Sequence, residues 1–234
     1  MREAIRNQGH TWNHKRIRRA YCELKLNLRQ KPKKRIPARD PQILLQPIHS
    51  NYCWSIDFMS DALTSGQRFR TLNIIDDYNR QALGILAGRS MPTRCVTEYL
   101  DFIAAFRGYP KMIRTDNGPE FISKEFLKWA IKHQIEIKHI QPGKPAQNGF
   151  IERFNRTYRE DILDAYLFNT ITEVQEITNK WLHDYNYYRP HESLKNLSPI
   201  EFSRSLDGMP SRELYGAVAK QQQNINNHST LDLY

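Results

Sequence analysis

The chain has 234 residues, 39% of them hydrophobic and four of them tryptophan, which excludes a wholly disordered protein and allows one good-sized core. Its three cysteines are odd in number and widely spaced, which excludes a disulfide framework and a cysteine zinc site. The net charge of +10 sits in residues 1–40, where 13 Lys and Arg face 3 acids, whereas residues 41–234 hold 22 of each. Such a segregated block points to a polyanion partner such as nucleic acid, and a solvated basic tail is the alternative.

The first forty residues predict a helix followed by an extended arm. Asn13 can cap a helix in which Ile17 and Leu24 lie on one apolar stripe. Prolines and like charges in residues 29–39 prevent helix and keep the chain extended. We interpret this arm as a linker that lies on DNA phosphates. Its contact candidates are Lys33, Lys34 and Arg35.

Residues 41–166 predict the main domain. Apolar, β-branched runs predict five strands, at residues 52–59, 68–76, 81–87, 112–116 and 135–140. Short turns between the first three predict an antiparallel meander, and helical patterns then alternate with strands. This order predicts an α/β fold, a mixed five-stranded sheet flanked by helices on both faces.

Two further segments follow the main domain. Thr170 and Glu173 are spaced as a capping box at the start of another amphipathic helix. We expect residues 167–208 to form a packed helical extension of the core. Residues 209–234 are polar, and we expect a loosely ordered tail.

Three acids carry the chemistry. Asp57 is expected to end the first strand, Asp116 the fourth strand before an obligatory turn, and Glu152 to open a helix, with 35 residues between the last two. A carboxylate at a strand end lies at a sheet edge where an ion can reach it. Taken singly, each acid has a plainer explanation, either as a turn former or as a favourable charge at a helix N-terminus.

Four other acids are given structural explanations. Asp76 and Asp77 are the main rivals of the trio, and we interpret them as turn caps. Asp61 is expected in a loop, and Glu120 is expected to cap the turn after Asp116.

Five segments together resemble one family. They are WSIDFMSD (residues 54–61), NIIDDYNR (73–80), TDNGPEF (115–121), QNGFIERFN (147–155) and YNYYRPH (185–191). The chain resembles the OrfB-like catalytic proteins of insertion-sequence transposases in these five segments. It also resembles them in having two Asp residues followed, after a gap of 35 residues, by a Glu. That family belongs to the retroviral-integrase, or DDE, superfamily. The resemblance implies a ribonuclease-H-like fold.

The resemblance also implies an activity, that of a DDE polynucleotidyl transferase that cleaves and joins DNA at insertion-sequence ends. Asp57, Asp116 and Glu152 would hold two Mg²⁺ or Mn²⁺ ions, with Asp57 bridging them. Arg159 would hold DNA phosphate beside the metals, and a surface ion pair is the alternative. Further candidates for DNA contact are Arg153, Arg156, Lys144, Gln147 and Asn148.

The implied partners are double-stranded DNA, as transposon ends and target, and further copies of the chain. An upstream helix-turn-helix is expected of the family, and here a partner protein would supply it. No apolar run is long enough to span a membrane, so we expect a cytoplasmic, nucleoid-associated bacterial protein.

Two alternatives remain open. One is a non-catalytic DNA-binding product of a truncated element. The other is a ribonuclease-H-type nuclease on RNA–DNA hybrids, which the 35-residue gap disfavours.

Overall fold

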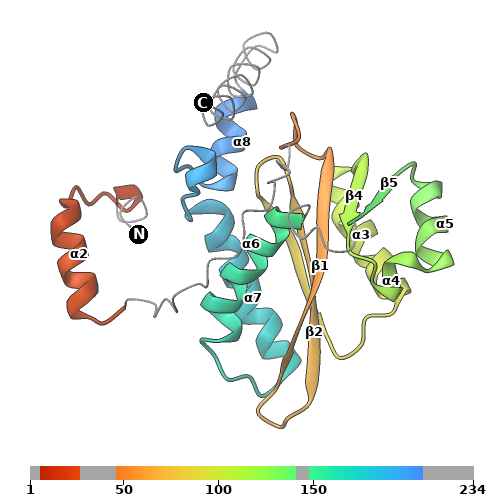
Figure 1. Cartoon of the computed structure of the whole chain (residues 1–234), viewed down its shortest axis with the longest axis horizontal. Coiled ribbons are helices and arrows are strands. Elements are labelled where there is room, and N and C mark those ends of the chain that lie inside the picture. The colour runs from red at the N-terminus through yellow and green to blue at the C-terminus, as the bar shows by residue number, and fades with distance from the viewer. Residues whose placement is uncertain (1–5, 27–45, 141–147, 208–234) are drawn as a thin grey trace, which may run out of the picture.

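The computed structural model describes residues 6–26, 46–140 and 148–207. At its centre is a five-stranded sheet in the order β3-β2-β1-β4-β5 (Figure 1). The strands are β1 (Cys53–Ala62), β2 (Arg68–Asp76), β3 (Ala82–Gly88), β4 (Met112–Thr115) and β5 (Glu136–His139). The pairs β1–β2 and β2–β3 are antiparallel, whereas β1–β4 and β4–β5 are parallel. The predicted meander and the mixed sheet are both confirmed.

Strand β1 is longer than its local sequence predicts. Its pairing with β2 continues to the register pair Ala62 and Arg68 at the hairpin end. As a result Asp61 lies within the strand, and its expected place in a loop is wrong. Asp57 likewise lies inside β1 and not at its end, so the expected strand-end position is also wrong.

Helices cover both faces of the sheet (Figure 1). The helices of the described residues are α2 (His14–Glu23), which does not cover the sheet, α3 (Thr93–Arg107), α4 (Pro119–Ile122), α5 (Lys124–Lys132), α6 (Gly149–Tyr158), α7 (Ile171–Tyr187) and α8 (Pro199–Asp207), with a π-helical turn at Arg159–Leu163 and a 3₁₀ turn at Glu192–Leu194.

The predicted caps form. The Asn13 side chain accepts a hydrogen bond from the Lys15 N–H at 2.9 Å, and Thr170 accepts one from the Glu173 N–H at 3.1 Å. The Glu173 carboxylate reaches back to the Asn169 N–H at 2.8 Å, one residue before the position that a capping box predicts.

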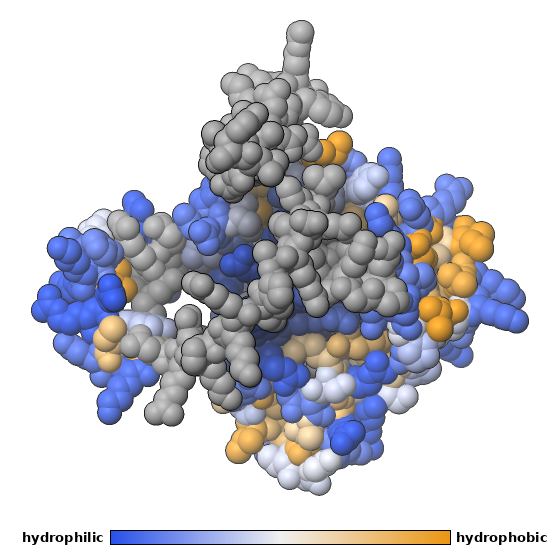
Figure 2. All heavy atoms as spheres, viewed as in Figure 1, coloured by the Kyte–Doolittle hydropathy of each residue, from blue (hydrophilic) through white to orange (hydrophobic). Residues whose placement is uncertain are grey.

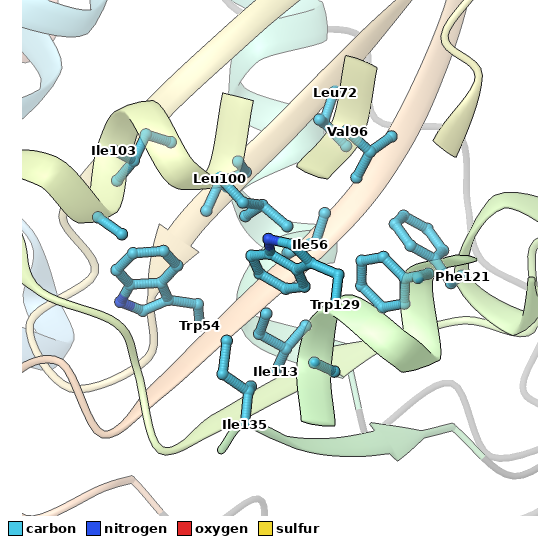
Figure 3. Packing of buried hydrophobic residues seen from close by; sticks show 14 of the residues in the cluster. Trp54, Ile56, Leu72, Val96, Leu100, Ile103, Ile113, Phe121, Trp129 and Ile135 are labelled. Carbon is cyan, nitrogen blue, oxygen red and sulfur yellow. The ribbon is translucent and has the colours of Figure 1, made fainter. Parts of the chain in front are cut away.

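Two hydrophobic clusters lie on opposite faces of the sheet. Trp54 and Ile56 of β1 pack with α3 and α5 in the first cluster (Figure 3). Met59 of β1 packs with Phe154 of α6 and Tyr185 of α7 in the second. Because successive strand residues point to opposite faces, Asp57 shares the face of Met59 and lies under α6. The strand period therefore places Asp57 on the α6 side of the sheet.

Outside the core, helix α2 stands apart from the sheet (Figure 1). Hydrophobic side chains are exposed on the opposite side of the molecule, over α4 and α5, where Ile122 and Ile131 are 53% and 77% exposed (Figure 2). Within the described part of the chain, no helix combines the length and apolar character needed to cross a bilayer.

Candidate active site

Asp57 is a partly buried carboxylate, and hydrogen bonds hold both of its oxygens. Its Oδ1 accepts the Phe58 N–H at 2.9 Å, and its Oδ2 accepts Asn155 Nδ2 at 2.8 Å. Asn155 belongs to α6, so this bond ties the helix to the strand beneath it. Each carboxylate oxygen has two lone pairs, and one on each remains uncommitted by these bonds.

Asp116 follows directly after β4, which pairs with β1 in parallel. The residue is exposed, and its Oδ1 accepts the Gly118 N–H at 3.0 Å, which forms the turn that the sequence predicts. A Cβ at Gly118 would stand 3.0 Å from the same Asp116 oxygen, so a larger residue there would crowd the carboxylate. The TDNGPEF turn thus presents an acid at the end of a central strand.

Glu152 lies in the first turn of α6, as predicted, and is exposed. Its charge is favourable there because the helix dipole is positive at the N-terminus.

The three acids are electrostatically coupled. The pKa of Asp57 is raised to about 6, first because burial disfavours its charge, and further by the negative charges of Asp116 and Glu152. The Phe58 N–H and the Asn155 amide oppose this rise. Residues far apart in the sequence therefore share one electrostatic site.

The site is not arranged around an ion. Among the residues described, no three His, Cys, Asp or Glu side chains stand together closely enough to hold a metal. The donor chemistry nevertheless fits Mg²⁺, which prefers hard carboxylate oxygens and retains several waters. A divalent cation would relieve the repulsion that the charges of Asp116 and Glu152 exert on the Asp57 carboxylate.

Arg159 lies seven residues after Glu152, where the helical run from α6 turns into its π-helical segment. Its guanidinium is already occupied. Nη1 lies 3.2 Å from Asp61 Oδ2 and 3.5 Å from Asp164 Oδ1, and Nη2 donates to the Ser60 carbonyl at 2.9 Å. The ion-pair alternative is therefore present in the structure, with Asp61 and Asp164 as the partners of Arg159.

The remaining candidates for DNA contact fall into three groups. Arg153 and Arg156 are exposed on α6. Asn148 is only 4% exposed at the start of that helix, so it presents little side chain to a ligand. Five candidates lie outside the described residues, namely Lys33, Lys34, Arg35, Lys144 and Gln147.

The rival acids have structural partners. Asp76 accepts the backbone N–H groups of Asn51 and Tyr78, which confirms its turn-capping role. Asp77 is buried and pairs with Arg114 at 2.6 Å, so its interpretation as a turn cap is wrong. Glu120 is also misassigned, since its carboxylate pairs with Arg70, and Asp116 itself caps the turn.

Sequence reasoning missed Asn155 and Asn73. Asn155 occupies the buried stripe of α6, and Asn73 interrupts the apolar run of β2. A polar residue at a buried position needs a hydrogen-bond partner, which is the signal that could have identified both. Asn73 donates a hydrogen bond to Asn155, and Asn155 donates one to Asp57.

Comparison with known proteins identifies the family of the chain. Two models of the integrase core domain match the chain, one over residues 47–145 and one over residues 133–199. An insertion element IS407 protein of Burkholderia multivorans is 39% identical over 199 residues, which cover 85% of this chain and 72% of that protein. An insertion element IS476 protein of Xanthomonas euvesicatoria is 36% identical over 203 residues, covering 87% of this chain and 59% of that protein.

Solved structures support the fold. A chain of the simian T-cell lymphotropic virus intasome aligns with a TM-score of 0.57 at 18% identity, over 77% of this chain and 63% of that one. The HTLV-2 integrase catalytic core domain, solved with magnesium, aligns with a TM-score of 0.50 at 18% identity, over 65% and 96% of the two chains. The fold is that of retroviral integrase cores. The chain therefore belongs to the integrase core domain family, alongside the proteins of bacterial insertion elements, and its function lies in DNA transposition and integration.

Proposed function

We propose that this chain catalyses metal-dependent cleavage and joining of DNA strands at insertion-sequence ends, as a DDE polynucleotidyl transferase. The observation that carries the proposal is where the three acids stand. Asp57 lies in β1, Asp116 directly follows the neighbouring strand β4, and Glu152 is in the first turn of α6, the helix that bonds Asp57 through Asn155.

Asp57 would bridge two Mg²⁺ or Mn²⁺ ions, Asp116 would hold one, and Glu152 the other. When bound, the ions would activate the attacking oxygen and stabilise the leaving oxygen of the phosphodiester. Asp57 is suited to bridging because hydrogen bonds leave one lone pair on each of its oxygens. Asp116 and Glu152 are exposed, so their side chains can change rotamer without disturbing the core.

The protein's own part in the reaction is to hold the DNA phosphate and orient the carboxylates. Arg153 and Arg156 project from α6, the helix that carries Glu152, and Arg159 lies one turn further along. We assign phosphate contact to these arginines and to the basic segment of residues 1–40. Water, and later a DNA 3′-hydroxyl, would be the nucleophile, so no covalent enzyme intermediate is needed.

The domain limits belong to the proposal as well. Residues 41–166 would be the catalytic core and residues 167–208 its helical extension, and α7 supports this because it packs in the same hydrophobic cluster as α6. Assembly would bring together further copies of the chain, two DNA ends and a helix-turn-helix partner protein on bacterial nucleoid DNA.

A nicking and strand-transfer assay with Mg²⁺ or Mn²⁺ tests the proposal. Asp116→Asn should abolish product while DNA binding remains. Glu160→Gln, which neutralises an exposed acid outside the trio, should keep wild-type activity. Equal behaviour of the wild type and Asp116→Asn would leave only a DNA-binding product of the element. Cleavage of an RNA–DNA hybrid in place of DNA joining would favour a ribonuclease-H-type nuclease.

A further inference from the structure

Behind Asp57 lies a chain of two amides that the catalytic trio does not include. Asn73 Nδ2 donates to Asn155 Oδ1 at 2.7 Å, and Asn155 Nδ2 donates to Asp57 Oδ2 at 2.8 Å. We propose that Asn73 is a positioning residue, which acts through Asn155 to hold the Asp57 carboxylate in the orientation that binds metal. This inference rests on the proposed role of Asp57.

Strand pairing explains why the three residues meet. Asp57 and Asn73 are register partners in the antiparallel β1–β2 ladder, so their side chains stand on the same face of the sheet. Helix α6 packs on that face through the second hydrophobic cluster, and Asn155 is one of its buried residues. Asn73 is fully buried and Asn155 is 8% exposed, so water cannot easily replace either bond.

The donor and acceptor roles in this series of hydrogen bonds follow from the carboxylate of Asp57 at its end. An ionised carboxylate only accepts hydrogen bonds, so Asn155 must turn its NH₂ group toward Asp57 and its oxygen toward β2. Asn73 supplies the donor that this oxygen needs. Without that donor, the Asn155 oxygen would lose this hydrogen bond at a buried position, and of these two bonds only the one to Asp57 would still hold the amide in place.

With the part of the chain that the structure describes, the Asn73 amide oxygen makes no hydrogen bond that would explain an asparagine at this position. Among the described residues its own Oδ1 has no hydrogen-bond partner, although the side chain is completely buried. An unpaired buried acceptor costs on the order of 1–3 kcal/mol, and an aliphatic residue would avoid that cost. The bond to Asn155 is therefore the interaction that distinguishes asparagine from an aliphatic residue here.

Direct Mn²⁺ binding to the full chain tests the inference, with free Mn²⁺ measured by electron paramagnetic resonance. Asn73→Leu should weaken Mn²⁺ binding about 10-fold, as is typical when the residue behind a metal ligand is lost. Thr71→Val is the matched control, because Thr71 lies two residues earlier on the same face, is 1% exposed and has an unpartnered Oγ1 among the described residues. It should bind Mn²⁺ as the wild type does.

Asp57→Asn separates failure of this inference from failure of the proposed function. If Asp57→Asn weakens Mn²⁺ binding while Asn73→Leu does not, the role of Asn73 is overturned and that of Asp57 stands. If neither substitution changes binding, Asp57 is not a ligand and both proposals fall. Weakening by Thr71→Val to the same extent as Asn73→Leu would also overturn the inference, since it would show a general effect of repacking.

If Asn73→Leu does not fold, a second variant and a second measurement still test the inference. Circular dichroism melting identifies such a case, and Asn73→Val then replaces Asn73→Leu. Should both unfold, side-chain amide resonances of the wild type decide. We expect the Asn73 and Asn155 NH₂ signals to shift together when Mg²⁺ is added, and an unmoved Asn73 signal would overturn the inference.

Discussion

Arg159 Nη1 lies 3.2 Å from Asp61 Oδ2, so the helical run that begins with α6 is tied to the far end of strand β1. The same guanidinium contacts Asp164 at 3.5 Å and is about one-third exposed. A DNA phosphate that uses Arg159 must therefore compete with two carboxylates. Whether phosphate replaces them can be measured.

Arg159→Gln should weaken DNA binding and reduce the salt dependence by about one charge, because one phosphate contact is lost. Asp61→Asn should strengthen binding several-fold, because it removes a competitor for the guanidinium. Fluorescence anisotropy between about 50 and 200 mM salt measures both effects. Glu160→Gln is the charge-matched control, and an equal gain from it would show that only net charge matters.

The raised pKa of Asp57 predicts a pH dependence of stability. In the folded protein this pKa is about 6, above its ordinary value of 3.8, so the protonated form is favoured by folding. The stabilisation is complete below about pH 3.8 and is lost as the pH rises through 6. With chelator present, the free energy of unfolding of the wild type should fall relative to Asp57→Asn by on the order of 2 kcal/mol over that window, discounted for partial exposure.

Urea unfolding from pH 4 to pH 8 measures this difference. Added Mg²⁺ should reverse part of the loss above pH 6, because the ion stabilises the charged carboxylate. A constant difference between the wild type and Asp57→Asn across the range would contradict the raised pKa of Asp57.

The buried pair of Asp77 and Arg114 predicts a large effect on stability. Asp77 has no exposed side-chain area and Arg114 has 10%, with 2.6 Å between Nη1 and Oδ2. Arg114→Ala should destabilise the fold by about 3–5 kcal/mol, since it leaves a buried charge without its partner. Chemical denaturation gives the value. Breaking the exposed Arg94–Glu98 pair by Arg94→Ala should change little, and a comparable loss there would refute the explanation.

Strand β3 lies at the edge of the sheet, and amide side chains of α7 cover its backbone. Asn186 pairs with both the N–H and the carbonyl of Ala82 at 2.9 Å, and Gln175 pairs with the Ala87 N–H and the Ile85 carbonyl at 2.8 Å. Asn186→Leu should cost about 1–3 kcal/mol of stability and promote self-association, because it exposes edge hydrogen-bonding groups.

Sedimentation and urea unfolding measure the two consequences of this substitution. Lys180→Ala, an exposed change on the same helix, should leave both unaltered. If Asn186→Leu stays as monodisperse and as stable as the wild type, the edge does not depend on these amides.

Much of the fold could be predicted because its signals are local. Asn13 and Thr170 mark helix starts because their side chains can accept hydrogen bonds from the first turn. Apolar residues at every second position predict the strands. The turn at Asp116 is fixed by Asn117 and Gly118, which follow it. The limits of β1 could not be predicted in this way, because its extension to Ala62 depends on the hairpin with β2.

The partners of charged and polar side chains likewise could not be predicted from the sequence. Asp61 was expected in a loop, but pairing with β2 keeps it in the strand, and Arg159 approaches it from a helix about a hundred residues later. Glu120 pairs with Arg70 of β2, and Asp77 pairs with Arg114 of β4, which no local pattern can indicate. These contacts depend on which strands become neighbours.

By itself, the sequence determined the family, the order of the strands and helices, and the acids with the spacing of a DDE site, since motif words and periodicity are properties of neighbouring residues. Only the tertiary structure decided that Asp57 lies inside β1, under α6, with Asn155 and Asn73 behind it. The physical reason is that burial, charge coupling and hydrogen bonding act through space, between residues that strand pairing and helix packing bring together.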